Sequence, residues 1–171
     1  MFSNLTLRKI IAYGSEDYDQ ALALRDSLLR RPLGLSLYDE DLSGEKDAYH
    51  LGIFKGPELA AVLVLIPKDS ATLQMRQVAV SQPLQGQHLG AKLVAFAESF
   101  ATTQGFTRIV LNARQTAEAF YHKQGYTTVS EPFVELGIGH VKMEKALSIE
   151  NWEWTMENYC GKAGGKIVDS G

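Results

Sequence analysis

The sequence predicts an α/β (α+β) fold in which a mixed, mostly antiparallel sheet is flanked by helices. Three strand-like segments follow one another with short turns between them, at residues 49–54, 58–66 and 73–80. A stretch with apolar residues at helical spacing then runs from about residue 89 to 104, and another strand-like segment covers 106–111. Strands joined by short turns form an antiparallel meander, whereas a strand reached through a crossover helix lies parallel to its predecessor.

The amino-terminal part of the chain predicts a first strand followed by a helix. Residues 5–13 read as the strand, which stops at a Gly-Ser pair followed by acidic residues that suit a helix start. Residues 17–30 carry apolar side chains at helical spacing, and Pro32 with Gly34 ends that helix. The acidic stretch 39–47 is expected to be irregular or a short helix, with carboxylates that are mostly solvated.

Turn residues separate the next segments. Lys55-Gly56-Pro57 joins strands 49–54 and 58–66, which indicates a hairpin, and the second of these strands is apolar nearly throughout. Such a strand suits the centre of a sheet that is covered on both faces. Gly105 is expected to end the helix that follows the third strand, because glycine is common just beyond a helix C-terminus.

Composition limits the class of protein. A chain of 171 residues with 45% hydrophobic residues suits one domain with a substantial core, and a formal net charge of −3 without a basic run argues against a nucleic-acid partner. The single cysteine, Cys160, cannot form an internal disulfide and fits a reducing compartment. The longest apolar run, residues 59–67, is far too short to span a bilayer. We therefore expect a cytoplasmic protein without a membrane partner.

The segment Gln85-Gly86-Gln87-His88-Leu89-Gly90 connects strand 73–80 to the following helix. The first N–H groups of a helix have no intrahelical acceptor, and the helix dipole places partial positive charge at the same end. Glycines let the backbone approach a ligand closely, so this connection is a candidate phosphate-binding site. It lacks the Gly-Lys-Ser/Thr ending of a P-loop, and its glycines do not fit the dinucleotide-binding fingerprint.

What remains is the pattern Gln/Arg-x-x-Gly-x-Gly/Ala, which resembles the coenzyme A pyrophosphate loop of the GNAT superfamily of N-acetyltransferases. Gln85 takes its leading position and Gly90 its last, whereas His88 stands where the first glycine is usual. A histidine can adopt a positive φ there with some strain. His88 either contacts a phosphate through its ring or is a solvated residue at the helix terminus.

A second match follows in the order and at the separation found in the family. Ala117-x-x-Phe120-Tyr121-x-x-x-Gly125-Tyr126 is similar to the GNAT motif after the coenzyme loop, on a helix expected between a strand ending near Asn112 and Gly125. The segment 135–145 is similar to the closing strand of the ElaA-like branch. Together these resemblances cover roughly residues 5–146.

The resemblance implies a GNAT-like three-layer fold for residues 1–147, with splayed parallel strands at the acyl-CoA site. Residues 148–171 would be a partly flexible carboxy-terminal extension whose Trp152 and Trp154 pack on the domain or on a partner. The resemblance also implies an acyltransferase that moves the acetyl group of acetyl-CoA, its cosubstrate, to a primary amine of a small molecule or peptide. No metal is expected, because the four histidines and one cysteine show no ligand spacing. A homodimer stays open as the oligomeric state.

Tyr121 occupies the position from which GNAT enzymes frequently donate a proton to the departing sulfur of coenzyme A. Protonating a thiolate of pKa near 8.5 from a phenol of pKa near 10 is uphill by roughly 2 kcal/mol, so a strong hydrogen bond in the transition state would suffice. A tyrosine at a helix end can also serve packing alone. The coenzyme-binding residues that the resemblance implies are Val78, Ala79, Val80, Gln85, Gly86, Gln87, His88, Leu89, Gly90, Ala91, Asn112, Phe120 and Lys123. Phe120 also fits core packing, Asn112 an ordinary loop and Lys123 a solvated surface.

The general base and the acceptor stay open. Several GNAT enzymes carry a catalytic glutamate where this chain has Gln74, and glutamine cannot act as a base. Deprotonation of the amine would go through water or another residue, with His50, Glu40 and Asp41 as candidates. Two rival functions are a binding module that holds acyl-CoA without transferring it, and an interaction protein that uses the carboxy-terminal tail.

Overall fold

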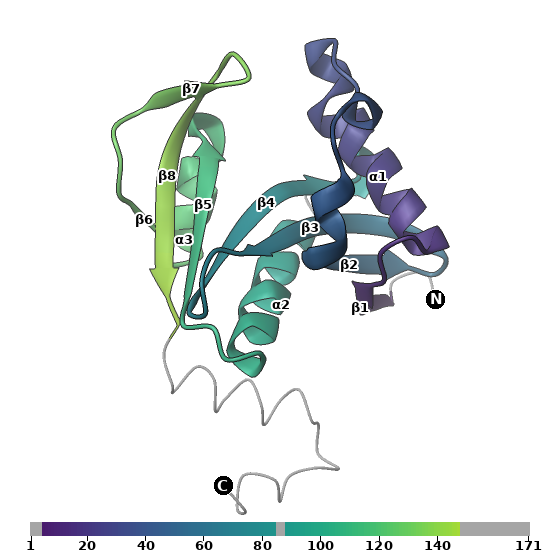
Figure 1. Ribbon diagram of the computed structural model, residues 1–171, viewed down its shortest axis with the longest axis horizontal. Helices are drawn as coiled ribbons and strands as arrows, with labels where there is room; N and C mark the ends of the chain where they lie inside the picture. Colours follow the sequence, from purple (N-terminus) through teal and green to yellow (C-terminus); the bar gives the residue numbers. More distant parts are fainter. Residues whose placement is uncertain (1–4, 85–87, 148–171) are drawn as a thin grey trace, which may run out of the picture. The chain divides into compact units, whose positions relative to one another are not determined.

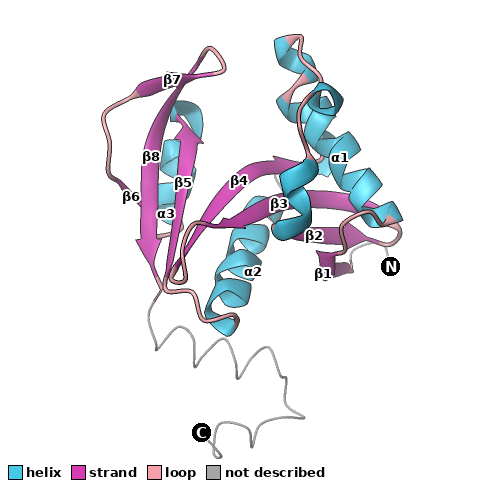
Figure 2. Cartoon of the chain, viewed as in Figure 1, coloured by secondary structure: helices cyan, strands magenta, loops and turns pink. Residues whose placement is uncertain are grey.

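The computed structural model describes residues 5–84 and 88–147, and within them eight strands form one mixed sheet (Figure 1). The strands hydrogen-bond in the order β1-β2-β3-β4-β5-β8-β6, and β7 pairs with β8. Their bounds are β1 Thr6–Ile11, β2 Tyr49–Lys55, β3 Glu58–Pro67, β4 Thr72–Val80, β5 Arg108–Arg114, β6 Thr127–Thr128, β7 Phe133–Glu135 and β8 Ile138–Ala146. The helices are α1 Glu16–Leu29, α2 Leu89–Thr103 and α3 Glu118–Lys123 (Figure 2). This is the mostly antiparallel α/β architecture with flanking helices that the sequence predicts.

The chain divides into two compact units. The first comprises residues 1–67 and 74–96, and the second comprises residues 68–73 and 97–171. β4 and α2 therefore each contribute residues to both units. Within the described ranges, no helix is both long and apolar enough to cross a bilayer.

Two buried strands form the centre of the first unit. β2 pairs antiparallel with β1, where Ile11 lies opposite His50, and also with β3, where Tyr49 lies opposite Leu65. Every residue of β3 from Leu59 to Leu65 is buried, which confirms the expectation of a strand covered on both faces. Gly52 of β2 is closely surrounded, because a Cβ there would lie 2.8 Å from Leu59 Cδ1. The hairpin predicted at Lys55-Gly56-Pro57 joins β2 to β3.

Side chains of β1 show which helices cover the two faces of this sheet. Lys9 Nζ donates to Asp17 of α1 at 2.8 Å and lies 4.6 Å from the ring centroid of Phe54. The guanidinium of its neighbour Arg8 lies 5.5 Å from the ring centroid of Phe96 in α2. Successive side chains of a strand point to opposite faces, so α1 and the first part of α2 lie on opposite sides of the sheet.

Helix α1 supplies much of the core of the first unit. Its N-terminus is capped by Ser15, whose side-chain oxygen accepts from the backbone N–H of Tyr18 at 3.1 Å. The buried face of the helix packs with residues of β1, β2, β3, β4 and the 3₁₀ turn Leu37–Asp39. This core consists of Ile11, Tyr18, Ala21, Leu22, Leu37, Phe54, Leu59, Val62 and Ala79.

The second unit is built on β8. β5 pairs with it antiparallel from Arg108 opposite Ala146 to Arg114 opposite His140, and the short strands β6 and β7 also pair with it. Gly125, just after α3, has a φ of +95°, a conformation that glycine adopts without the steric cost of a Cβ. The chain turns there and places the buried Tyr126 beside the helix.

Two boundaries differ from what the sequence predicts. The strand expected at 106–111 is β5, which ends at Arg114, so Asn112 lies inside the strand and not at its exit. The reason is the pairing with β8, which extends to Arg114 and leaves the polar side chain of Asn112 on the exposed face. The helix expected to carry Ala117 begins as a 3₁₀ turn, Gln115–Ala117, and becomes α-helical only from Glu118.

Candidate functional site

The connection before α2 contains a residue in the left-handed conformation. His88 has a φ of +62°, at the position where the coenzyme loop pattern usually has glycine, and its side chain is exposed. The backbone N–H of Lys92 donates to the His88 carbonyl at 3.1 Å, so the helical ladder begins there. The N–H groups of Leu89, Gly90 and Ala91 then belong to the first turn, where helices leave donors for a ligand. The predicted site residues Gln85, Gly86 and Gln87 lie outside the described residues.

The strand that precedes this connection is interrupted at Gln77. Gln77 has a φ of +54°, although it lies inside β4 and is not a glycine. Residues 73–80 are predicted to be a regular strand, and the left-handed Gln77 departs from that prediction. A residue in this conformation breaks the regular alternation of backbone groups, as in a β-bulge. It directly precedes the predicted site residues Val78, Ala79 and Val80, of which Ala79 is buried and the two valines are half-buried.

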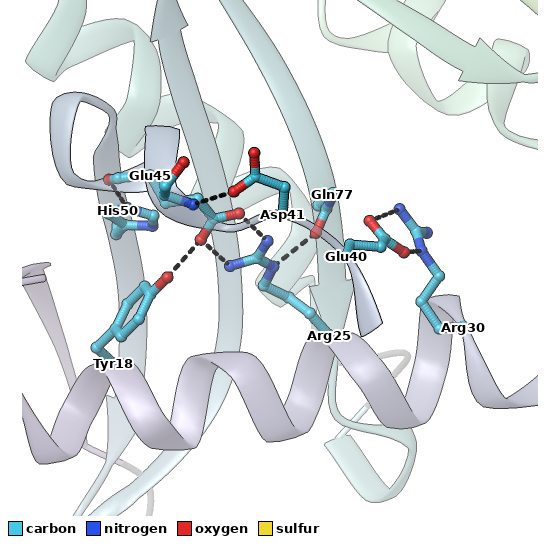
Figure 3. A network of polar contacts seen from close by, with 9 residues as sticks. Tyr18, Arg25, Arg30, Glu40, Asp41, Glu45, His50 and Gln77 are labelled. Carbon is cyan, nitrogen blue, oxygen red and sulfur yellow. Dashed lines mark hydrogen bonds and ion pairs between the residues drawn. The ribbon is translucent and has the colours of Figure 1, made fainter. Parts of the chain in front are cut away.

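A buried arginine of α1 holds the side chain of Gln77. The Nε of Arg25 donates to Gln77 Oε1 at 2.7 Å (Figure 3). The two terminal nitrogens of the same guanidinium donate to the two carboxylate oxygens of Glu45, at 3.0 and 2.6 Å. Arg25 is 0% exposed, and the side chain of Glu45 is 16% exposed. The two terminal nitrogens of Arg25 therefore bind a carboxylate, and its Nε–H binds a side chain of β4.

Glu45 is itself fixed by two further contacts. The hydroxyl of Tyr18 donates to Glu45 Oε1 at 2.7 Å, and Nε2 of His50 donates to the Glu45 backbone carbonyl at 2.8 Å (Figure 3). The rings of Tyr18 and His50 meet edge to face, with centroids 5.1 Å apart. Nδ1 of His50 is buried and has no hydrogen-bond partner among the described residues. We call the five residues Tyr18, Arg25, Glu45, His50 and Gln77 the Arg25 network.

The network fixes the charge of its members. Burial raises the pKa of Glu45, but the hydrogen bonds from Arg25 and Tyr18 outweigh it and hold the pKa below its usual range. Burial, followed by the hydrogen bond to Glu45, raises the pKa of Tyr18, and burial lowers the pKa of His50. Glu45 is therefore ionised, and Tyr18 and His50 are neutral, at physiological pH.

The three candidate bases occupy different surroundings. His50 is 1% exposed and belongs to the Arg25 network. Glu40 is exposed and accepts from Nε of Arg30 at 2.5 Å. Asp41 is exposed and accepts from the backbone N–H of Ser43 at 3.0 Å; bonds with Ser43 hold the pKa of its carboxyl below the usual range. Gln74, at the usual glutamate position, is half-buried in β4.

Tyr121 lies in the second unit among aromatic rings. Its ring centroid is 5.0 Å from that of Phe120 and 5.8 Å from that of Tyr126, and both pairs are edge to face. Tyr121 is 7% exposed, and burial raises the pKa of its hydroxyl to about 12. The group stays protonated through the physiological range and can donate a hydrogen bond.

The other predicted site residues of this unit lie at its surface. Phe120 is half-buried on α3, and Lys123 is exposed in the last turn of the helix. Asn112 is exposed on β5, and its side-chain nitrogen donates to Glu135 Oε1 at 3.3 Å. Within residues 5–84 and 88–147, no cluster of three or more His, Cys, Asp or Glu side chains could hold a metal ion.

Most of the Arg25 network was not predicted from the sequence. His50 was a candidate base, whereas Tyr18, Arg25, Glu45 and Gln77 were not candidate site residues. A signal was present, because the buried positions of α1 are 18, 21, 22, 25 and 26, and position 25 is an arginine. A charged residue in the apolar stripe of a helix indicates a buried partner of opposite charge.

Comparisons with known proteins agree with this architecture. A family described as "Acetyltransferase (GNAT) domain" matches residues 36–147. The uncharacterized N-acetyltransferase YitI of Bacillus subtilis is 28% identical over 117 residues, which cover 64% of this chain and 77% of that protein.

Solved structures of acetyltransferases share the fold. A putative N-acetyltransferase from Lactobacillus plantarum superposes with a TM-score of 0.77 at 24% identity, covering 85% of this chain and 100% of that one. Escherichia coli ElaA gives 0.70 at 22% identity, covering 82% and 99%. A GNAT family acetyltransferase from Elizabethkingia anophelis with acetyl-CoA bound gives 0.63 at 19% identity, covering 84% and 99%. At these identities the likeness concerns the fold.

Proposed function

This chain belongs to the GNAT acetyltransferase family, and from that membership we propose that it transfers an acetyl group from acetyl-CoA to a primary amine. The observation that carries the proposal is the left-handed His88 at the start of α2, which leads the chain into a helix end suited to an anion. The acetyl-CoA bound to the Elizabethkingia relative of the same fold supports the choice of cosubstrate. The acceptor is a small-molecule or peptide amine.

Coenzyme binding would use backbone groups more than side chains. We propose that the pyrophosphate binds at Gln85 to Ala91 and that backbone groups of Val78 to Val80 hydrogen-bond the pantetheine arm. The first turn of α2 carries no acidic residue, so no carboxylate there would repel the phosphates. Asn112, Phe120 and Lys123 are the further contacts that the family pattern suggests.

The transfer itself would be direct. The neutral amine attacks the thioester carbonyl carbon, a C–N bond forms as the C–S bond breaks, and the amine proton leaves to solvent. Tyr121 would donate a hydrogen bond to the sulfur as it becomes a thiolate. With a phenol pKa of about 12, full transfer of its proton to a thiolate of ordinary pKa would cost about 5 kcal/mol. We therefore assign Tyr121 the role of a hydrogen-bond donor to the developing charge.

Water is the proposed acceptor of the amine proton. Gln74 has no basic group, and the buried His50 is already engaged with Glu45. Glu40 is already engaged in an ion pair with Arg30. The ammonium form of the acceptor loses one proton to solvent before it binds, and the attacking nitrogen loses a second proton to water as the amide forms. Neither transfer needs these side chains.

The proposal extends to the branch of the family, the domain bounds and the location. The fold similarity to Escherichia coli ElaA supports placing the chain in the ElaA-like branch. The family match ends at residue 147, which supports an acetyltransferase domain of residues 1–147 with 148–171 as an extension outside the described residues. A cytoplasmic location remains our proposal from the composition.

Calorimetric titration with acetyl-CoA tests the coenzyme site. Gly90→Glu places bulk and negative charge in the first turn of α2, whereas Ala95→Glu adds the same group at an exposed position of the same helix. We expect the unmodified protein and Ala95→Glu to bind, and Gly90→Glu to remain folded without binding.

Release of free coenzyme A with a panel of primary amines then tests transfer. Acetyl-CoA binding without release by any amine would favour a non-catalytic binding module. Failure of the unmodified protein to bind acetyl-CoA would overturn the proposal.

A further inference from the structure

We infer that Arg25 is a positioning residue for acetyl transfer, because its guanidinium, anchored on Glu45, holds the left-handed backbone of Gln77. The inference rests on the proposed function and adds to it a residue on another element, α1, that sets the shape of β4. Arg25 would act through Gln77 and would not touch the substrates.

The backbone of Gln77 needs an external restraint. A non-glycine residue with a φ of +54° brings its Cβ close to its own backbone, and such conformations persist only where the surroundings hold them. The side chain of Gln77 supplies the point of attachment, since its Oε1 accepts from Arg25 Nε at 2.7 Å. Loss of this hydrogen bond would let the residue relax toward the extended conformation of its strand neighbours.

Arginine suits this restraint because its donors are arranged as a planar fork. Two terminal nitrogens engage both oxygens of Glu45, and Nε remains for Gln77. A lysine ammonium could keep the charge beside Glu45, but it could not reproduce the three contacts in their fixed directions. Arg25→Lys therefore keeps the positive charge beside Glu45 and removes the planar arrangement of three donors.

The anchor is rigid because Glu45 is held from several elements. Tyr18 of α1 donates to its carboxylate and His50 of β2 donates to its carbonyl (Figure 3). These bonds hold the 3₁₀ turn Ser43–Asp47 against both α1 and β2. All of these contacts lie within the first compact unit. The guanidinium thus connects α1, the turn and β4 at one point.

A role in folding alone is a poor explanation for this pair. Burying two charges costs desolvation energy that their attraction seldom exceeds, and apolar residues of similar size often stabilise as well. A function in geometry explains the arrangement better, because Val78, whose backbone is proposed to contact the acetyl-CoA arm, directly follows the held residue. Misplacing a reacting group by a fraction of a bond length lowers turnover more than affinity.

The test uses paired substitutions at residues 25 and 77. Gln77→Ala removes the hydrogen bond and keeps the steric strain of a left-handed residue, whereas Gln77→Gly removes the hydrogen bond and the strain together. We expect kcat to fall about 10- to 100-fold in Arg25→Lys and in Gln77→Ala, with the KM for acetyl-CoA changed far less. We expect Gln77→Gly, alone or combined with Arg25→Lys, to recover most of the lost turnover.

Arg30→Lys is the matched control. Arg30 directly follows α1 and pairs with a carboxylate, that of Glu40. Among the described residues its side chain donates to Glu40 and to the Leu29 carbonyl, and not to β4. We expect its kcat to equal that of the unmodified protein. Thermal unfolding of each variant shows whether it is folded. If Arg25→Lys is not folded, comparison of Gln77→Ala with Gln77→Gly tests the inference by itself.

A crystal structure of Arg25→Lys supplies a readout that does not depend on activity. We expect residue 77 to leave the left-handed region in this variant. A left-handed residue 77 in Arg25→Lys, or equal loss of kcat in Gln77→Ala and Gln77→Gly, would overturn the inference. Absence of acetyl transfer by the unmodified protein would instead overturn the proposed function, so the two failures are distinct.

Discussion

The hydroxyl of Tyr18 donates to Glu45 Oε1 at 2.7 Å, across 27 residues of sequence. The carboxylate that receives it also accepts two hydrogen bonds from Arg25, so Tyr18 completes the solvation of a half-buried charge. A neutral donor that faces an ion is among the stronger hydrogen bonds of a protein.

Removing that hydroxyl should destabilise the protein. We expect Tyr18→Phe to lower the free energy of unfolding by about 2 kcal/mol, because the carboxylate of Glu45 loses a donor that water cannot fully replace. Tyr13→Phe is the matched control, since the ring of Tyr13 lies 4.9 Å from that of Tyr18 but the residue is 48% exposed. Urea unfolding measures both variants. Equal free energies for the two would show that the contact contributes nothing.

Stability should depend on pH through His50. Burial lowers the pKa of its imidazole below the ordinary value of 6.5. As the pH falls below that value, the unfolded chain binds a proton that the folded protein does not, so stability should decrease by up to about 1.4 kcal/mol per pH unit. The lowered pKa of Glu45 adds a further loss of stability as the pH falls through its ordinary value of 4.5, which lies below the ordinary value of His50.

His50→Gln tests this assignment, because glutamine has no proton to bind in this range. Urea unfolding of the unmodified protein between about pH 7.5 and 5.5 should show the decrease, and the variant should show a smaller slope whatever its absolute stability. Identical slopes would assign the pH dependence to other groups.

Two substitutions of His88 distinguish a coenzyme contact made by its backbone from one made by its ring. At a φ of +62°, glycine is unstrained and alanine is not, so we expect His88→Gly to be more stable than His88→Ala by about 1 kcal/mol. Calorimetric titration with acetyl-CoA then gives the affinity of each. If the backbone makes the coenzyme contact, His88→Gly should bind as tightly as the unmodified protein. Weakened binding in both variants would point to the ring.

Tyr121→Phe tests the proposed donor to the sulfur. We expect kcat to fall by about 10- to 100-fold while the KM for acetyl-CoA changes little, because the hydrogen bond strengthens only as negative charge develops. Tyr126→Phe makes the same change in the neighbouring buried ring, whose centroid is 5.8 Å away, and should retain turnover. Unchanged kcat in Tyr121→Phe would remove the residue from this role.

The order and type of the main elements could be predicted because periodicity reports burial. After Glu58, β3 is apolar and is buried along most of its length, and the apolar stripe of α1 faces the core as its spacing indicates. The predicted end of β5 was wrong because that end depends on pairing with β8, about 30 residues away. The local composition near Asn112 does not indicate this pairing.

The site was predicted less completely, for a related reason. The loop and the Tyr121 segment are contiguous in sequence, so a pattern can identify them. The Arg25 network joins residues from α1, a 3₁₀ turn, β2 and β4, and the left-handed conformation of Gln77 follows from a contact between residues 52 positions apart. Nothing near Gln77 in the sequence distinguishes it from a regular strand residue.

The hydrogen bond between His50 and the Glu45 carbonyl also decides which tautomer the ring adopts. A carbonyl can only accept, so the hydrogen must reside on Nε2, and Nδ1 keeps a bare lone pair in the interior. Protonation would turn that lone pair into an N–H group with no acceptor among the described residues. The fold therefore disfavours protonation of His50 at Nδ1. The nitrogen chemical shifts of this imidazole would report whether the interior around Glu45 is intact.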